Sequence, residues 1–382
     1  MSNDIEIGRF KRARQAYSLD DVAIVPSRRT RDPQDVSTSW QIDAYSFDTP
    51  FIAAPMDSVM SPDTAIELGR QGGVGVLNLE GVWTRYEDPE KVLTEIASLE
   101  SATEHGTDPR VTRRLQELLA APIQPELIKA RLEQIREAGV VVAGSLTPQR
   151  TQEHYKTVLE AGVELFVIRG TTVSAEHVSE RHEPLNLKKF IYELDVPVIV
   201  GGAAGYTPAL HLMRTGAAGV LVGFGGGATG TTRRAMGIHV PMATAIADVA
   251  AARSDYLDES GGRYVHVIAD GGVSTSGDIV KAMALGADAV MLGTALARAE
   301  EAPGRGWHWG MEAAHDSVPR GDRVRVGTVG PMSQVLHGPS HHTNGTSNLV
   351  GMLRKSMATT GYVDLKSFQK VDMILAPYQA GS

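Results

Sequence analysis

The chain has 382 residues, of which 42% are hydrophobic, enough for one large or two ordinary globular domains. Its formal net charge is −8, and Lys and Arg are scattered, so we expect no nucleic-acid partner. No apolar run approaches the roughly 18 residues of a membrane span, and residues 1–18 lack the apolar core of a signal peptide. We therefore expect a cytoplasmic protein without a membrane partner. The absence of cysteine excludes disulfides, thiolate nucleophiles and thiolate metal ligands.

Short apolar segments recur along the chain, and most follow a glycine that ends a helix-length stretch. Apolar runs without polar alternation are typical of parallel strands that are buried on both faces. In chain order they lie in 50–56, 70–78, 137–146, 160–170, 196–203, 215–225, 264–272 and 285–294. Eight such units over about 300 residues predict an α/β fold, the (β/α)8 TIM barrel. The rival is an open doubly wound sheet, whose phosphate turn normally follows the first strand, whereas here the glycine-rich turns follow strands six to eight.

Two long segments interrupt this repeat. Residues 82–135, between strands two and three, are charged and helical in pattern but too short for an independent domain. We expect them to lie over the barrel rim as helices. Residues 298–348, after strand eight, are rich in Gly, Pro, His and Ser and predict a long loop over the active face. The prediction is one TIM-barrel domain over 1–382 with a helical insertion at 82–135.

Glycine-bearing turns follow strands six, seven and eight, which would bring them to one mouth. Their sequences are GFGGGATGTTRR at 223–234, IADGGVSTSGD at 268–278 and MLGTA at 291–295. Glycine lets backbone N–H groups approach an anion closely, and late strand ends are the usual phosphate site of barrels. The turns therefore predict a phosphate site. Asp270 is a candidate for ribose hydroxyls, the alternative being a helix N-cap or the partner of a buried arginine.

Five segments make the chain resemble the IMP dehydrogenase and GMP reductase family over nearly its full length. They are YSLDDVAIVPSR (17–28), TPFIAAPMDSVM (49–60), VGFGGGATGTTR (222–233), VIADGGVSTSGDIVKAMALGADAVMLGT (267–294) and NLVGMLRKSMATTGY (348–362). The chain resembles in particular the IMP dehydrogenase-related branch without the tandem CBS module, and 82–135 stands where longer relatives carry that pair. The resemblance implies an oxidoreductase of guanine nucleotide metabolism that acts on IMP, XMP or GMP with NAD(P), assembled as a homotetramer.

The resemblance also implies roles for individual residues. Gly272, Gly293 and Thr294 would hold the 5′-phosphate of a purine nucleoside monophosphate, Asp270 its ribose and Met56 its base. The carbonyls of Gly225, Gly227 and Gly230 correspond to the family's monovalent cation site, which takes K+. Thr231 and Thr232 match the threonines after the catalytic residue, and Arg169 and Thr171 fall at the cofactor side.

Position 230 departs from the family where the chemistry is expected. The family has a cysteine there, which attacks C2 of IMP or carries the purine during GMP reduction, and this chain has Gly230. A covalent route needs an activated nucleophile, and the nearby threonine hydroxyls have no identified base. Arg169 replaces the aspartate that binds the nicotinamide ribose, and Gly202 replaces an asparagine to the purine. Arg169 would contact a phosphate or carboxylate, or pair with an insertion glutamate or Asp57.

Three functions stay open on this reading. They are an oxidoreductase of the family, a non-catalytic purine-nucleotide-binding or regulatory protein, and a different reaction on another phosphate ester. Two smaller features also have two interpretations each. His337, His341 and His342 are metal ligands or exposed loop residues, and Trp307 and Trp309 are a hydrophobic anchor or a base-stacking platform.

Overall fold

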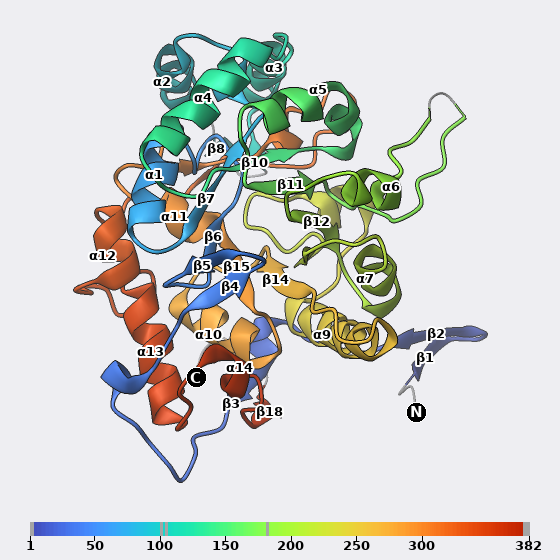
Figure 1. Ribbon diagram of the computed structural model, residues 1–382, viewed down its shortest axis with the longest axis vertical. Helices are drawn as coiled ribbons and strands as arrows, with labels where there is room; N and C mark the ends of the chain where they lie inside the picture. Colours follow the sequence, from blue (N-terminus) through green and yellow to red (C-terminus); the bar gives the residue numbers. More distant parts are fainter. Residues whose placement is uncertain (1–3, 100–101, 104–105, 181–182, 377–382) are drawn as a thin grey trace.

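A closed barrel of parallel strands forms the centre of the molecule (Figure 1), in a computed structural model that describes residues 4–99, 102–103, 106–180 and 183–376. The strands are hydrogen-bonded in the order β10, β11, β12, β13, β14, β15, β6 and β7. Their bounds are β6 Phe51–Ala53, β7 Val74–Asn78, β10 Ala143–Leu146, β11 Leu165–Arg169, β12 Val198–Ala203, β13 Gly219–Val222, β14 His266–Asp270 and β15 Ala289–Leu292. Because β15 pairs in parallel with β6, the sheet has no edge. This confirms the predicted (β/α)8 barrel and excludes the open sheet.

The barrel strands form because their apolar residues are covered on both faces. In β11, Phe166, Val167 and Ile168 are all fully buried, with helices outside the barrel and packed side chains inside it. Full burial of one such side chain stabilises the fold by about 1.5–3 kcal/mol. The register places Val167 opposite Ser145 of β10 and Ile199 of β12. Since all eight strands run in one direction, the segments that follow them meet at one mouth.

The helices around the barrel begin at clear start signals. Three of them, α1, α4 and α5, have proline at the first position, where the missing N–H is not needed. In α10, Thr275 and Asp278 form a capping box, in which each side chain accepts the backbone N–H of the other. The ring consists of α1 Pro62–Arg70, α4 Pro125–Glu137, α5 Pro148–Glu160, α6 Leu187–Tyr192, α7 Tyr206–Met213, α9 Met242–Glu259, α10 Ser276–Ala284 and α13 Leu349–Thr359.

The described part of residues 82–135 contains three α-helices in two different positions. α2 (Pro89–Ser98) and α3 (Pro109–Leu119) lie against the segment that follows β15. The contacts include a 2.8 Å ion pair of Arg305 with Glu90 and a 2.9 Å hydrogen bond from Gln116 to the carbonyl of His315. α4 packs instead against α1 and α5, as the helix between strands β7 and β10 of a barrel does (Figure 1). The part that departs from the strand–helix repeat is the α2–α3 pair.

The segment 298–348 is more regular than the loop that its composition predicts. It contains β16 (Trp307–His308) paired with β17 (Val324–Arg325), the 3-10 helix η4 (Met311–Ala314) and α12 (Met332–His337). Trp309 is fully buried, and the guanidinium of Arg323 lies 4.1 Å from the ring centre of Trp307. Neither tryptophan lines a cavity at the mouth, which favours the hydrophobic anchor over the stacking platform. Such long-range contacts leave no mark on local composition.

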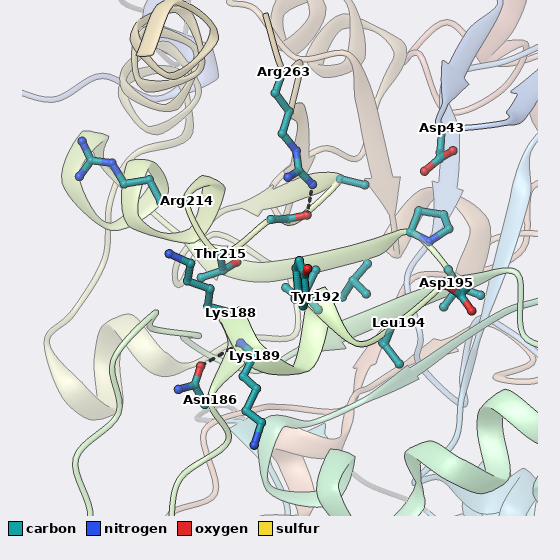
Figure 2. A pocket seen from close by; sticks show the side chains of 16 residues that line it. Asp43, Asn186, Lys188, Lys189, Tyr192, Leu194, Asp195, Arg214, Thr215 and Arg263 are labelled. Atoms are coloured by element: carbon teal, nitrogen blue, oxygen red, sulfur yellow. Dashed lines mark hydrogen bonds between the residues drawn. The ribbon is translucent and has the colours of Figure 1, made fainter. Parts of the chain in front are cut away.

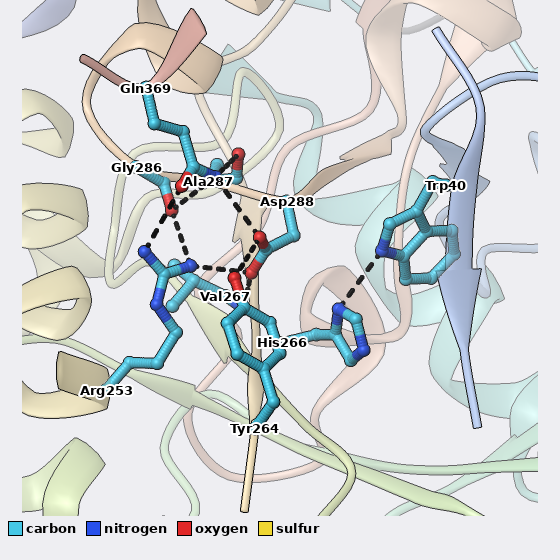
Figure 3. Close-up of polar contacts among 9 residues, drawn as sticks. All are labelled: Trp40, Arg253, Tyr264, His266, Val267, Gly286, Ala287, Asp288 and Gln369. Carbon is cyan, nitrogen blue, oxygen red and sulfur yellow. Dashed lines mark hydrogen bonds and ion pairs between the residues drawn. The ribbon is translucent and has the colours of Figure 1, made fainter. Parts of the chain in front are cut away.

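At the amino ends of β14 and β15, a polar network surrounds the carboxylate of Asp288 (Figure 3). It accepts hydrogen bonds from Arg253 at 2.7 Å, the hydroxyl of Tyr264 at 2.6 Å, the N–H of Val267 at 2.8 Å and Gln369 at 3.1 Å. Beside this network, Trp40 Nε1 donates to Nδ1 of His266 at 3.2 Å. The side chains of Arg253 and Asp288 are only 12% and 10% exposed, so the carboxylate is both buried and fully partnered.

Short elements flank the barrel. The antiparallel pairs are β1 Asp4–Gly8 with β2 Lys11–Arg14, β3 Val22–Ile24 with β18 Met373–Leu375, β4 Trp40–Ile42 with β5 Tyr45–Phe47, and β8 Ala102–Thr103 with β9 Gly106–Thr107. The remaining helices are η1 Leu19–Asp21, η2 Pro33–Asp35, η3 Val82–Thr84, α8 Thr232–Met236, α11 Thr294–Ala297 and α14 Leu365–Phe368. Among the helices in the described ranges, none has the length and apolar character to cross a bilayer.

Candidate functional site

A cavity of about 300 Å³ opens where the strands end. Its walls come mainly from the glycine-bearing turns after β13, β14 and β15. The residues singled out in the sequence that line it are Met56, Arg169, Thr171, Gly202, Gly225, Gly227, Gly230, Thr232, Asp270, Gly272, Gly293 and Thr294. Thr231 does not line this cavity, because its N–H turns toward the carbonyl of Arg320, 2.9 Å away. The fold thus gathers at one mouth nearly all the residues that the sequence pattern marked.

The turns after β14 and β15 have backbones that require glycine or leave no room for a larger residue. Gly271 and Gly272 have φ angles of +107° and +70°, which L side chains rarely adopt. A Cβ at Gly293 would lie 3.2 Å from Nε2 of His308 and 3.6 Å from the sulfur of Met56. A larger residue at 293 would therefore fill the cavity. The exposed backbone of these turns suits a bound anion.

His308 is a cavity residue that the sequence analysis missed. It is 3% exposed, and its Nδ1 lies 3.1 Å from the hydroxyl of Ser58, which in turn donates to the carbonyl of Trp309. Since the serine proton is committed to that carbonyl, Nδ1 of His308 carries the ring proton and Nε2 is left as an acceptor near Gly293. Burial and the charge of Arg298 lower the pKa of His308 to about 4. An anion beside Nε2 would raise that pKa again.

Gly230 stands in a tight turn at the edge of the cavity. Its N–H donates to the carbonyl of Gly227 at 3.0 Å, and the residue pairs in an antiparallel bridge with Gly321 of the segment after β15. Its φ lies outside the left-handed region, and a Cβ here would meet only the carbonyl oxygen of Gly227, at 3.4 Å. The backbone at position 230 therefore accepts a side chain without strain.

Arg169 forms an ion pair across the mouth. Its Nε donates to Asp270 at 2.9 Å, and its Nη1 lies 3.7 Å from Glu312. Glu312 belongs to the long segment after β15, so a glutamate of an inserted segment is indeed a partner, whereas Asp57 is not. The alternative role of Asp270 as the partner of an arginine is confirmed, because the barrel brings the ends of β11 and β14 to the same mouth. Burial alone would lower the pKa of Arg169, but the attraction of the two carboxylates outweighs burial and raises it. The arginine is charged, and Asp270 is already partnered.

A second cavity, of about 730 Å³, adjoins the first. The two share Met56, Arg169, Gly170, Thr171, Glu312 and Arg320 in their linings. Arg320, which the sequence analysis did not single out, donates to the hydroxyl of Thr171 at 2.9 and 2.6 Å. The second cavity is also lined by Asn78 and Ser145 at strand ends, by Arg150 near the start of α5, and by residues of α3. Helix α3 and the residues that follow it therefore complete a cavity beside the predicted nucleotide site.

A buried carboxylate, Asp57, supports the turn after β6 that carries Met56. It accepts the N–H of Val82 at 3.0 Å and the side-chain amide of Asn78 at 3.4 Å. Burial raises the pKa of Asp57 to about 7, although the N–H of Val82 and the charge of Arg85 oppose the shift. A Cβ at Gly81 would lie 1.9 Å from the carboxylate, so the contact depends on glycine there.

The three histidines of the HGPSHH segment lie apart from this mouth. His337 donates through Nε2 to the carbonyl of Gln71 at 3.1 Å, and His341 and His342 are exposed. Within the ranges that the structure describes, no three His, Asp or Glu residues are grouped as metal ligands.

Comparison with known proteins assigns the chain to a family. The family model of the IMP dehydrogenase / GMP reductase domain matches residues 16–381. An uncharacterized oxidoreductase of Mycobacterium tuberculosis is 55% identical over 97% of this chain and 99% of its own length. The inosine-5′-monophosphate dehydrogenase of Methanocaldococcus jannaschii is 26% identical over 94% of this chain and 92% of its own.

A solved structure agrees with the sequence comparisons. The crystal structure of an IMP dehydrogenase/GMP reductase-like protein from Corynebacterium glutamicum is 51% identical, with a TM-score of 0.92 over 98% of both chains. The match extends over the barrel and the segments around its mouth, since hardly any of either chain lies outside it. The chain belongs to the IMP dehydrogenase / GMP reductase family.

Proposed function

We propose that the chain binds a purine nucleoside monophosphate (IMP, XMP or GMP) at the barrel mouth and acts on it as an oxidoreductase with NAD(P). The observation that carries this proposal is the cavity in which the glycine turns at Gly272 and Gly293 meet Met56 and Thr294. Backbone N–H groups of these turns would bind the phosphate, and His308 would meet it through Nε2. The base would lie toward Met56.

The phosphate would supply most of the affinity. Asp270 has to exchange Arg169 for ribose hydroxyls, so its net gain on binding is small. On the side of the base, Gly202 has no side-chain amide to recognise the purine. A side chain would not fit there, because a Cβ would lie 2.5 Å from the carbonyl oxygen of Gly223. These two features weaken recognition of the ribose and the base. They do not affect the glycine turns that would bind the phosphate.

The second cavity fits NAD(P) in position and size, because it opens directly onto the predicted nucleotide site. Arg150 and Arg320 are suited to the phosphates of a dinucleotide, and Asn78 and Ser145 to its hydroxyls. When bound, the cofactor would supply hydride transfer. At the end of β11, however, Arg169 is a donor only and cannot accept hydrogen bonds from a ribose diol. Two residues further along the chain, the hydroxyl of Thr171 can accept a hydrogen bond, but it already accepts from Arg320.

The K+ site implied by the family receives less support. Of the carbonyls of Gly225, Gly227 and Gly230, that of Gly227 accepts the N–H of Gly230 and points into its own turn. The carbonyl of Gly227 is therefore already engaged within the turn rather than free for a cation.

The lack of a thiolate at Gly230 favours a second candidate function. Without a thiolate, the family's covalent route is closed. A purine-nucleotide-binding protein that senses or regulates guanine nucleotide metabolism would keep the phosphate turns and lose the cysteine. Both candidates share the same binding site, and they differ in turnover.

We propose further that the chain assembles as a homotetramer, as barrels of this family do. Light scattering at micromolar concentration measures this directly, and a monomer across that range would contradict it.

Calorimetry tests the proposed function. IMP, GMP and XMP are titrated into the protein, and the titrations are repeated with NAD and NADP present. We expect a purine nucleoside monophosphate to bind and the corresponding nucleoside, without its phosphate, to bind at least about 100-fold more weakly. Absence of binding by all three nucleotides contradicts both candidates. Binding without absorbance change at 340 nm on addition of the cofactor supports the non-catalytic one.

A further inference from the structure

His308 is held so that one of its two ring nitrogens is left for a ligand. It lies on β16, and its Nδ1 is 3.1 Å from the hydroxyl of Ser58. The same hydroxyl accepts the N–H of Trp309 at 3.1 Å and donates to the carbonyl of Trp309 at 2.8 Å. With its proton committed to that carbonyl, the hydroxyl accepts from Nδ1 of His308. Nε2 is therefore the nitrogen that is available to the cavity.

Nε2 of His308 borders the space beside Gly293. A Cβ at Gly293 would lie 3.2 Å from Nε2, so the open side of the glycine and the ring nitrogen face the same part of the cavity. Within the described part of the chain, no group donates a hydrogen bond to Nε2. A phosphate oxygen and the Nε2 of a neutral ring are both acceptors. If they meet at this turn, a proton has to lie between them.

The cations around His308 do not supply that proton. Burial and the charge of Arg298, which follows α11, lower the pKa of His308 to about 4, so the ring is neutral at pH 7 in the free protein. Arg323 and Arg325, beside and on the paired strand β17, lie over the ring of Trp307 instead, at 4.1 and 5.9 Å from its centre.

The carboxylates near His308 are engaged with other groups. Asp57, beside Ser58 in the chain, accepts a backbone N–H and a side-chain amide. Across the cavity, Asp270 and Glu312 both face Arg169, at 2.9 and 3.7 Å. An incoming phosphate is then the anion that would stabilise a charged ring at this place.

We propose that nucleotide binding at the mouth takes up one proton from solvent, which is held on Nε2 of His308 against the phosphate. The inference rests on the proposed function, because it needs a phosphate at the Gly293 turn. In the charged ring Nδ1 still donates to Ser58, so the bonds that hold the ring need no rearrangement.

This uptake makes affinity depend on pH in a defined direction. A phosphate monoester is dianionic above its second pKa of about 6 and brings its own proton below it. Above pH 7 the free nucleotide and the free His308 both lack the proton that the complex holds. Affinity should therefore fall roughly tenfold for each further pH unit.

A groove near the amino end of β12 provides a contrast (Figure 2). Its volume is about 610 Å³, and it is lined by the cations Lys188, Lys189, Arg214 and Arg263 and by two carboxylates, Asp43 and Asp195. Ammonium and guanidinium groups are already charged at neutral pH, so a phosphate bound there would take up no proton. Proton uptake therefore distinguishes binding beside His308 from binding in this groove.

Calorimetry in two buffers of different ionisation enthalpy measures the uptake. IMP, GMP and XMP are titrated into the protein at pH 6 and pH 7.5. A bound nucleotide should take up about one proton at pH 7.5, and IMP and GMP roughly half a proton at pH 6, where about half of each free phosphate is already protonated. Binding without uptake at pH 7.5 overturns the inference and leaves the nucleotide site standing. No binding by any of the three overturns both.

His308→Gln separates the histidine from other sources of proton uptake. Its side-chain amide can donate to a phosphate without taking up a proton, so the uptake at pH 7.5 should fall close to zero. The matched control is His337→Gln, which should keep the uptake, because His337 lies apart from the mouth and contacts the carbonyl of Gln71. Circular dichroism checks the folding of both variants. Uptake that survives in folded His308→Gln overturns the inference.

Nitrogen-15 NMR of the histidine-labelled native protein is a measurement that does not depend on a variant. The chain has 12 histidines, and one ring should pass from the neutral to the charged form when the nucleotide saturates the protein at pH 7.5. A spectrum in which no histidine ring changes its protonation on saturation overturns the inference.

Discussion

The two ends of the barrel each carry an arginine–aspartate pair, and the pairs differ in their surroundings. At the amino ends of the strands, Asp288 accepts hydrogen bonds from a side-chain cation, a hydroxyl, an amide and a backbone N–H (Figure 3). At the mouth, Asp270 accepts a single side-chain hydrogen bond from Arg169 and borders an open cavity. The first pair has its hydrogen-bonding capacity filled, whereas the second borders open space, where we propose that Asp270 exchanges Arg169 for a ligand. The two pairs differ in how many hydrogen bonds the carboxylate already accepts rather than in charge.

Removing the two carboxylates tests this distinction most strongly. Asp288→Ala leaves Arg253 buried without its counter-ion and should lower the free energy of unfolding by about 3–5 kcal/mol. Asp270→Ala should cost about 1 kcal/mol, because Arg169 keeps Glu312 and reaches water in the cavity. Urea unfolding followed by circular dichroism gives both values. Equal losses of unfolding free energy in the two variants would show that the pairs at the two ends of the barrel do not differ.

Substitution in the glycine turns at the mouth should lower nucleotide affinity strongly, as substitution of Asp288 should lower stability. Gly293→Val brings a side chain against His308 and Met56 and should lower affinity for IMP or GMP by at least about 100-fold. The control is Gly277→Ala in α10, whose Cβ would meet only the hydroxyl of Thr275, at 3.7 Å. Isothermal calorimetry measures both. If the Gly293→Val variant keeps its affinity, the phosphate does not bind at that turn.

The pH dependence of stability separates Asp57 from both pairs. Its pKa is raised from 3.8 to about 7 in the folded protein, so folding favours the protonated form. The stabilisation is complete below pH 4 and is lost as the pH rises to 7. Asp57→Asn should therefore flatten that slope and raise the unfolding free energy at pH 8 on the order of 2 kcal/mol. Thermal unfolding from pH 4 to 8 checks this, and an unchanged slope would assign the titration to another group.

Gly230→Cys should have the smallest effect on stability and the most informative effect on activity. Room for a Cβ and an ordinary φ predict a change below about 1 kcal/mol in unfolding free energy. The native protein should turn over IMP and NAD far below the roughly 10 s⁻¹ typical of enzymes. The variant should show IMP-dependent reduction of NAD, or a covalent purine adduct by mass spectrometry. Robust native turnover would mean that the chemistry does not need a thiolate.

Local patterns in the sequence predicted the barrel well, because each buried strand has its own apolar run and most of these runs follow a glycine that ends a helix. They also located Gly272, Gly293 and Met56, which line the same cavity. An arginine partner for Asp270 was among the alternatives, but its identity as Arg169 was not predictable in this way, since the two residues are 101 positions apart and the pairing depends on how side chains turn at the mouth.

The segment after β15 contains the site residues that the sequence did not predict. His308 and Arg320 line the mouth from within a stretch whose Gly and Pro content indicated only a loop. Their positions depend on Ser58 and Thr171, which lie in distant segments. The α4 helix was grouped with the insertion for a similar reason, because its packing against α1 and α5 is not visible in its own sequence.

The ordinary backbone at Gly230 has an evolutionary consequence. Glycine codons GGU and GGC become cysteine codons UGU and UGC by a single nucleotide substitution, and nothing in the backbone of this turn opposes that exchange. In a large population this substitution arises repeatedly. Because it would disturb the fold little, selection against it on structural grounds would be weak. Continued glycine among the descendants of this gene would then measure selection on chemistry rather than on folding.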